Sequence, residues 1–185
     1  MTMYILSQVC VFIGFAIDAS SYFFKTKKNF LFLCIIYSSF YTLSYVFLNL
    51  YLPMIANIIF FVRNLWYKYL NDKNKSFKAY LIPIFVLNAA FITSFVLLYA
   101  SPLDFFLLAS ILLLTVVFAL KNMLIIRIFA VFNGALWAVY NFIVKGYVNF
   151  ACNILMMIII LITIFIHHIL PKIKEKKIEK LQSSK

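Results

Sequence analysis

A stretch of forty residues with one short polar break decides the fold of this chain. Residues 105–144 are FFLLASILLLTVVFALKNMLIIRIFAVFNGALWAVYNFIV. A single helix of that length would be about 60 Å long, twice the thickness of the hydrocarbon core of a bilayer. The chain must therefore fold back, and Lys121-Asn122 is the polar break suited to a turn. The stretch predicts two membrane-spanning helices, over 103–120 and 124–144.

The composition of the whole chain also indicates a membrane protein. Of 185 residues, 66% are hydrophobic and 12% are charged, with a mean hydropathy of +1.03. Soluble domains are about 45–50% apolar, and a soluble chain of this size cannot bury so much apolar surface. A β-barrel would show short segments of alternating polarity instead of continuous runs. We therefore predict an all-α membrane protein.

Five further apolar runs bring the number of predicted transmembrane helices to seven. These runs cover residues 4–24, 29–49, 52–70, 77–99 and 147–168. The polar segment 71–76 and the turn at 101–104 set the fourth helix apart from its neighbours. The predicted organisation is a first three-helix bundle over 1–71, a linker helix over 72–100, a second three-helix bundle over 101–169 and a basic tail over 170–185.

The basic residues predict how the helices are oriented. With the N-terminus outside, 15 of the 17 lysines and arginines fall on the cytoplasmic side, Lys145 falls outside and Arg63 lies within the membrane. Loops rich in lysine and arginine face the cytoplasm. Lysines follow the first apolar run and none precedes it, which is the reverse of a signal peptide. We expect a multi-pass protein of the bacterial inner membrane with an outside N-terminus and a cytoplasmic C-terminus.

Several other classes of function are not expected. The net charge of +12 comes from loops and the tail rather than from a basic face with interleaved aromatic residues, so we expect lipid and not nucleic acid as a partner. Cys10, Cys34 and Cys152 have no metal-ligand spacing, which predicts no metal site. Catalytic motifs are absent from the sequence, and we predict neither an enzyme nor a cofactor.

The chain carries an internal repeat. A shift of 96 residues places the first three predicted helices on the last three, with Asn57 on Asn153. Two polar stripes then coincide: Tyr37, Tyr41, Ser44 and Tyr45 in one half, and Asn133, Trp137, Tyr140 and Asn141 in the other. Each stripe follows the spacing i, i+4, i+7, i+8, which lies on one face of a helix. Because a single helix separates the two three-helix halves in this scheme, the two halves run in the same direction.

This 3+1+3 arrangement resembles the SWEET sugar transporters and the wider SWEET/PQ-loop group. That resemblance implies an aromatic residue on the second helix and an asparagine on the third helix of each half, facing a central substrate. Trp137 and Asn153 match this pattern in the second half, and Asn57 matches it in the first, where Tyr41 stands in place of a tryptophan. The Pro-Gln motif and the hinge prolines of that group are missing, so its gating mechanism is not implied.

A second resemblance covers nearly the whole chain. The segments Leu6-Ser7-Gln8 and Val62-Arg63-Asn64, and the run from Lys121 through Trp137 to Tyr147, are similar to the YgjV family of bacterial inner-membrane proteins. That family is grouped with the SWEET-like folds. The resemblance implies the fold and the location and says little about chemistry.

The paired asparagines and aromatic residues are the candidate binding site. Asn57 and Asn153 lie about 9 Å inside the predicted outer ends of their helices, and Tyr41 and Trp137 about 12 Å, so the four could line one cavity. Asparagine offers donors and an acceptor, and an aromatic ring offers a stacking surface. The full predicted set comprises Tyr37, Tyr41, Asn57, Asn133, Trp137, Asn141 and Asn153. The alternative is that the asparagines are packing contacts worth about 0.6 kcal/mol each.

Asp18 and Arg63 are charged residues at similar depth in the first half, and each is costly within a membrane. Their equivalents in the second half, Leu114 and Ile159, are both apolar. This joint absence predicts a structural ion pair between Asp18 and Arg63. Two alternatives are that one of them is a proton or substrate site and that Arg63 extends toward the cytoplasm.

These features favour a transporter for a small neutral polar solute, such as a sugar or a nucleoside, with a central site between the two bundles. The alternative is a membrane scaffold or sensor that transports nothing and whose polar stripes are helix contacts. A hydrated cavity ringed by the asparagines and aromatic residues would favour the first, and a dry apolar centre the second. The sequence leaves a homo-oligomeric assembly open.

Overall fold

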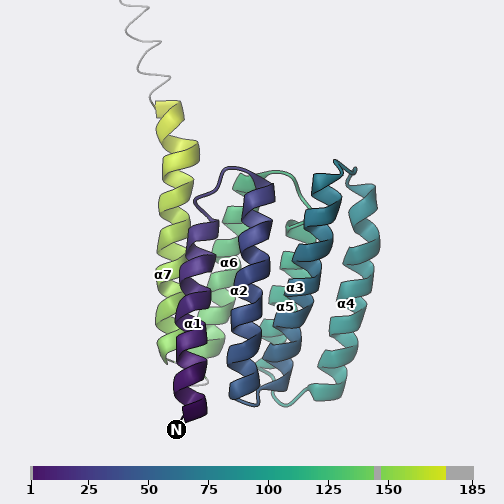
Figure 1. The fold of residues 1–185 in the computed structure, drawn as a ribbon, viewed down its shortest axis with the longest axis vertical. Coiled ribbons are helices and arrows are strands. Elements are labelled where there is room, and N and C mark those ends of the chain that lie inside the picture. Colours follow the sequence, from purple (N-terminus) through teal and green to yellow (C-terminus); the bar gives the residue numbers. More distant parts are fainter. Residues whose placement is uncertain (1, 144–146, 174–185) are drawn as a thin grey trace, which may run out of the picture.

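The protein is a bundle of α-helices that stand side by side and alternate in direction (Figure 1). The structure, a computed structural model, describes residues 2–143 and 147–173. Within these ranges it contains seven α-helices, one π-helical turn and no strand, which confirms the predicted all-α class. The helices are α1 (Thr2–Ser21), α2 (Lys27–Phe47), α3 (Tyr51–Asp72), α4 (Lys78–Leu98), α5 (Asp104–Val117), α6 (Met123–Ile143) and α7 (Tyr147–Ile164), followed by the π-helical turn η1 (Phe165–Ile169).

Five of these helices, α1, α2, α4, α6 and α7, are long and apolar enough to cross a membrane. The other two fall short for different reasons. Helix α3 has 22 residues, but it carries Asn57, Arg63 and Asn64, all of which are buried inside the bundle. Helix α5 has only 14 residues, or about 21 Å. That α3 and α5 also span the bilayer stays a prediction, although both run alongside the other helices (Figure 1).

The turns fall where the polar residues predicted them. Helix α5 ends and α6 begins on either side of Lys121-Asn122, where the Asn122 Oδ1 accepts the Leu124 N–H at 2.9 Å. Asn49 and Asn74 follow the ends of α2 and α3, and their φ angles of 55° and 49° are left-handed. Asparagine tolerates this conformation better than most residues, and at each end the N–H groups of the asparagine and of the next residue bond back to the last turn of the helix.

The three helices before α4 and the three after it pack against one another in the same pattern. We call α1–α3 the first triplet and α5–α7 the second triplet. In the first, α2 packs against both α1 and α3, and in the second, α6 packs against both α5 and α7. Contacts of α1 with α7 and of α3 with α5 join the triplets, and α4 packs against α3 and α5. The division into two bundles and a linker helix stays a prediction.

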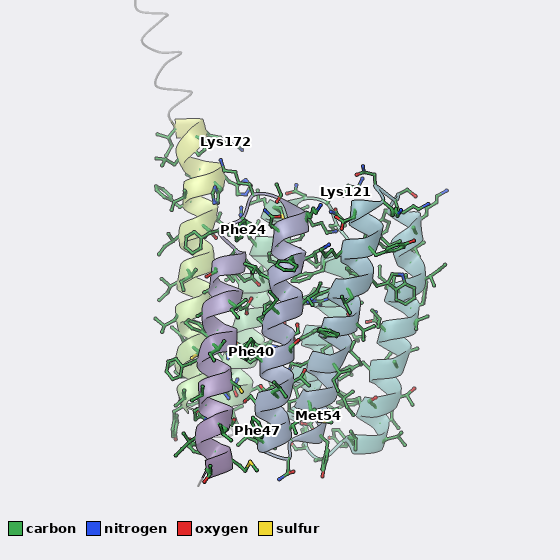
Figure 2. The ribbon with its side chains drawn as sticks, in the orientation of Figure 1. Phe24, Phe40, Phe47, Met54, Lys121 and Lys172 are labelled. Carbon is green, nitrogen blue, oxygen red and sulfur yellow. The ribbon has the colours of Figure 1, made fainter. Side chains whose placement is uncertain are left out.

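The two ends of the bundle differ in charge. Phe24, Lys121 and Lys172 lie toward one end, and Phe47 and Met54 lie toward the other, which is also where α1 begins (Figure 2). We call these the basic end and the N-terminal end. The predicted cytoplasmic side corresponds to the basic end, and this orientation stays a prediction. The predicted turn at Lys145-Gly146 and the basic tail beyond residue 173 lie outside the described residues.

Candidate functional site

A polar cavity lies between the two triplets. Its volume is about 100 Å³, which is room for several water molecules. Both triplets contribute to its wall, chiefly with amide and aromatic side chains. The lining residues are Val11, Asp18, Tyr22, Tyr37, Tyr41, Tyr45, Asn57, Phe60, Leu114, Asn133, Trp137, Asn141, Asn149, Cys152 and Asn153.

All seven residues of the predicted binding set line this one cavity. They come from α2, α3, α6 and α7, and the first and last of them, Tyr37 and Asn153, are more than a hundred residues apart in sequence. The bundle therefore brings the two polar stripes and both asparagines of the repeat face to face. Their role in binding a solute stays a prediction.

Three of the cavity asparagines are anchored in the same way. The Nδ2 groups of Asn57, Asn141 and Asn153 each donate to the backbone carbonyl four residues earlier in their own helix, at 2.9, 2.8 and 2.9 Å. One N–H of each amide is thereby used, and the side-chain oxygen and the second N–H are left for another partner. Asn57 and Asn153, which coincide in the repeat, share this geometry.

A hydrogen-bonded chain holds Trp137 at the cavity wall. The indole Nε1 donates to Ser110 Oγ at 2.8 Å, and Ser110 Oγ in turn donates to Asn133 Oδ1. The repeat places Gly14 of α1 where Ser110 stands in α5. A Cβ added to Gly14 would lie 3.5 Å from the ring of Tyr41, the equivalent of Trp137. In both triplets the first helix thus contacts the aromatic residue of the second helix.

The predicted ion pair between Asp18 and Arg63 is not formed in this structure. Among the described residues the two salt bridges join Asp72 to Lys28 and to Lys68, at the basic end. Asp18 Oδ1 is buried and has no hydrogen-bond partner. The prediction relied on the similar depth of the two residues in the membrane. Similar depth does not bring them into contact, because α2 packs between α1 and α3. The α2 residues Cys34 and Tyr37 are close enough to interact with both charges.

Arg63 is instead held by aromatic rings and an amide. Its side chain is 0% exposed, so it does not extend to solvent. The guanidinium carbon lies 4.6 Å from the ring centroid of Phe60 and 4.1 Å from that of Phe118, distances typical of cation–π contacts. Nε and Nη2 both donate to Asn64 Oδ1, at 3.1 and 2.9 Å. Arg63 therefore links α3 to the end of α5.

Aromatic rings close the cavity toward the basic end. Tyr22, which follows α1 and lines the cavity, contacts Phe30 edge to face at a centroid distance of 5.4 Å. Phe30 contacts Phe118 in the same manner at 5.2 Å. All three rings are buried, and they join α1, α2 and the end of α5 across the bundle. We call these three residues the aromatic seal.

Hydrogen bonds between the triplets reinforce this closure. Arg127 of α6 donates from Nη2 to the carbonyl oxygens of Tyr22 (2.8 Å) and Phe24 (3.0 Å). Lys27 of α2 donates from Nζ to the carbonyl oxygens of Ala119 (3.3 Å) and Leu120 (2.9 Å), just beyond α5.

Two further bonds cross the bundle on the same side. The Tyr67 hydroxyl donates to the Thr115 carbonyl at 2.8 Å, and His167 Nε2 donates to the Phe23 carbonyl at 3.1 Å. In the part of the chain that the structure describes, every hydrogen bond between the triplets lies toward the basic end.

The π-helical turn η1 brings a second histidine to this end. A π-turn changes the direction of the following side chains and is common at functional sites. His168 Nε2 accepts a hydrogen bond from Arg127 Nη1 at 2.8 Å. The end of α7 is thereby tied to the same arginine that holds the α1–α2 turn.

The cavity also extends to the N-terminal end of the bundle. Tyr45, Asn141 and Asn149 line it, and each lies within about one turn of the terminus of α2, α6 or α7 at that end. The structure therefore combines a closed basic end with a cavity that extends toward the N-terminal end.

Several functional candidates were not predicted as site residues. Asn149 lies three residues before Cys152 and four before Asn153, and both spacings share a helical face, which was a usable signal. Ser110 interrupts an apolar run, yet its role depends on the facing Trp137. Arg127 counted only toward topology in the sequence, because its acceptors lie about a hundred residues away. Residues 2–143 and 147–173 contain no group of three or more potential metal ligands.

The fold and the cavity define an integral, multi-helix membrane protein with an internal polar chamber. Residues 5–169 match the Imp-YgjV family, described as bacterial inner membrane protein, and the chain belongs to this family. Location in the bacterial inner membrane follows from this membership and from the apolar helices. No curated protein and no solved structure shows significant similarity to the chain.

Proposed function

We propose that this protein carries a small neutral polar solute across the bacterial inner membrane without changing it chemically. The observation that supports the proposal is the single cavity lined by Asn57, Asn153, Tyr41 and Trp137 from both triplets. A scaffold has no need of such a chamber, since helix contacts in lipid are best served by close packing. A polar side chain that faces a cavity in the membrane gives up stabilising helix–helix contacts, and binding a solute would explain why the protein tolerates this loss of stability.

The wall chemistry suits an uncharged ligand with hydroxyl groups. Amide oxygens and second N–H groups of Asn57, Asn141 and Asn153 offer paired acceptors and donors. The Trp137 and Tyr41 rings offer stacking surfaces on opposite halves of the repeat. No lysine or arginine lines the described wall, so an anionic solute has no counter-charge there. A sugar or a nucleoside fits this combination.

We infer an alternating-access cycle from the asymmetry of the two ends. The aromatic seal and the hydrogen bonds of Arg127 and Lys27 close the basic end, while the cavity extends toward the other. Solute enters from the N-terminal end, and release requires these contacts to break. With the predicted orientation this direction runs from outside to the cytoplasm.

Binding is measured with Trp137 as the reporter. The chain has two tryptophans, and Trp66 does not line the cavity. In a Trp66→Phe variant, Trp137 is the sole tryptophan, and pentoses, hexoses and nucleosides are titrated singly. A bound solute changes the Trp137 fluorescence saturably. The absence of any saturable change across the whole screen counts against a solute site.

Transport is then measured in proteoliposomes with the solutes that bind. Asn57→Ala and Trp137→Ala should each abolish uptake, whereas the protein still inserts and melts cooperatively. Asn88→Ala and Trp66→Phe are matched controls, since both residues lie outside the cavity wall. Equal uptake by the cavity variants and the controls would refute the proposed site, and bound solute that is never transported would favour a sensor.

A further inference from the structure

We propose that Asp18 is the proton-binding group of the cavity and that solute passage is coupled to the movement of this proton. Proton binding by Asp18 stands on its own geometry. The coupling rests on the proposed function.

Asp18 occupies the boundary between the chamber and its closure. It lines the cavity from α1, one helical turn before Tyr22, which belongs to both the cavity wall and the aromatic seal. The solute-binding candidates Asn57 and Asn153 lie further toward the N-terminal end. A group in this position is reached from the N-terminal end while the seal is closed and from the basic end once Tyr22 has moved.

The carboxyl group has no cationic partner among the residues that the structure describes. Its Oδ1 is buried and without a hydrogen bond, and no lysine, arginine or histidine among the described residues forms an ion pair with it. A carboxylate removed from water needs a cation or several hydrogen-bond donors. Ionisable residues in this position within a membrane protein characteristically serve ion or proton pathways. A buried carboxyl group without such partners is stable when it carries a proton of its own, which is the role we assign to Asp18.

A proton suits this carboxyl group better than a metal ion does. Sodium, magnesium and calcium require several oxygen ligands around one centre, and Asp18 is the sole carboxylate of the cavity wall. The groups of neighbouring elements close enough to interact with it are Tyr22 after α1, and Cys34, Tyr37 and Tyr41 of α2. Arg63 of α3 is close enough to Tyr22 and Cys34 to interact with both. Helix α7 brings Cys152 into the same cavity, and η1 brings His167 to the basic end.

The coupled step is a simple proton exchange. With the seal closed, the carboxylate takes a proton from a hydronium ion in the cavity and water is left. The neutral carboxyl group then donates its O–H to the solute, which the carboxylate cannot do. When the basic end opens, the solute leaves, and the carboxyl group returns its proton to water on that side. One proton thus accompanies each solute molecule.

Proton binding is tested by infrared difference spectroscopy of the purified full-length protein in lipid, without any solute. The chain has only five acidic side chains, so carboxyl bands are few. Changing the pH should reveal the C=O stretch of a protonated carboxyl group that is lost in Asp18→Asn. Asp72→Asn, which changes an exposed acid at the basic end, is the matched control and keeps this band. A pH-dependent spectrum that is the same in the parent and in Asp18→Asn overturns the proton site, and the amide bands verify that the variant is folded.

Coupling is tested in proteoliposomes containing a pH-sensitive dye, to which a mixture of pentoses, hexoses and nucleosides is added outside. The parent and Asp72→Asn should acidify the lumen in response to solute, and Asp18→Asn should not. Acidification that persists in Asp18→Asn overturns the inference. Solute uptake by the parent without acidification overturns the coupling and leaves the proposed function intact. If no solute enters, the coupling fails together with the proposed function, and the infrared result alone decides whether Asp18 binds a proton.

Discussion

Replacing Arg127 with leucine should open the basic end of the protein. Arg127 is 1% exposed and donates three hydrogen bonds, to the carbonyls of Tyr22 and Phe24 and to His168. Leucine retains apolar bulk and removes all three. Polar contacts between membrane helices are worth about 0.6 kcal/mol on average and about 1.7 at most, and two of the three bonds cross between the triplets, so the closed state loses about 1–3 kcal/mol. Since 1.4 kcal/mol is a factor of ten, the open population rises at least about sevenfold.

Cys34 is a native reporter of this opening. It is 0% exposed and lies on α2 close to the aromatic seal. In a Cys10→Ser, Cys152→Ser background, Cys34 is the only thiol, because the chain has three cysteines. When closing is faster than labelling, the rate of reaction with a water-soluble maleimide follows the open population. Arg127→Leu should therefore raise the labelling rate of Cys34 at least about sevenfold.

Two controls separate opening from general destabilisation. Lys68→Leu removes the exposed Lys68–Asp72 salt bridge at the same end, a contact worth less than about 1 kcal/mol, so its labelling changes less than about fivefold. A protein with Cys152 as the only thiol reports the cavity, and Arg127→Leu should not accelerate its labelling. The reasoning is refuted if Arg127→Leu changes Cys34 labelling less than about threefold, or accelerates both thiols equally.

Two further substitutions test the packing around the cavity. Ser110→Ala should lower the free energy of unfolding by about 1–3 kcal/mol, because the Trp137 indole N–H loses its acceptor. In a Trp66→Phe background it should also lower the fluorescence anisotropy of Trp137. Unchanged anisotropy would contradict the hydrogen-bonded chain. Gly134→Ala should lower the Tm, since its Cβ would lie 2.8 Å from Met157 Cγ, whereas Gly14→Ala meets nothing closer than 3.4 Å and should raise the Tm slightly through helix propensity. Thermal unfolding in detergent that gives shifts of the same sign would contradict this contrast.

Most residues that line the cavity were predictable because the spacing of residues along a helix determines which side chains share a face. Tyr37 and Tyr41, like Asn133 and Trp137, stand four residues apart and so share a helical face. The chamber follows once two such faces meet. The pairing of Asp18 with Arg63 was not predictable in this way, since equal depth in a membrane does not specify the rotation of each helix about its axis. In this structure α2 packs between the helices that carry the two charges.

Sequence alone determined the all-α class, the number of helices and the places where the chain turns. Each apolar run must be long enough to span the lipid by itself, so the membrane-spanning segments can be recognised from local sequence. Tertiary structure alone decided which end is closed and what holds it closed. Arg127 finds its acceptor at Tyr22, 105 residues away, and Lys27 finds Leu120 at a separation of 93. Hydrogen bonds are directional and short, so they depend on how helices distant in sequence rotate and slide against one another.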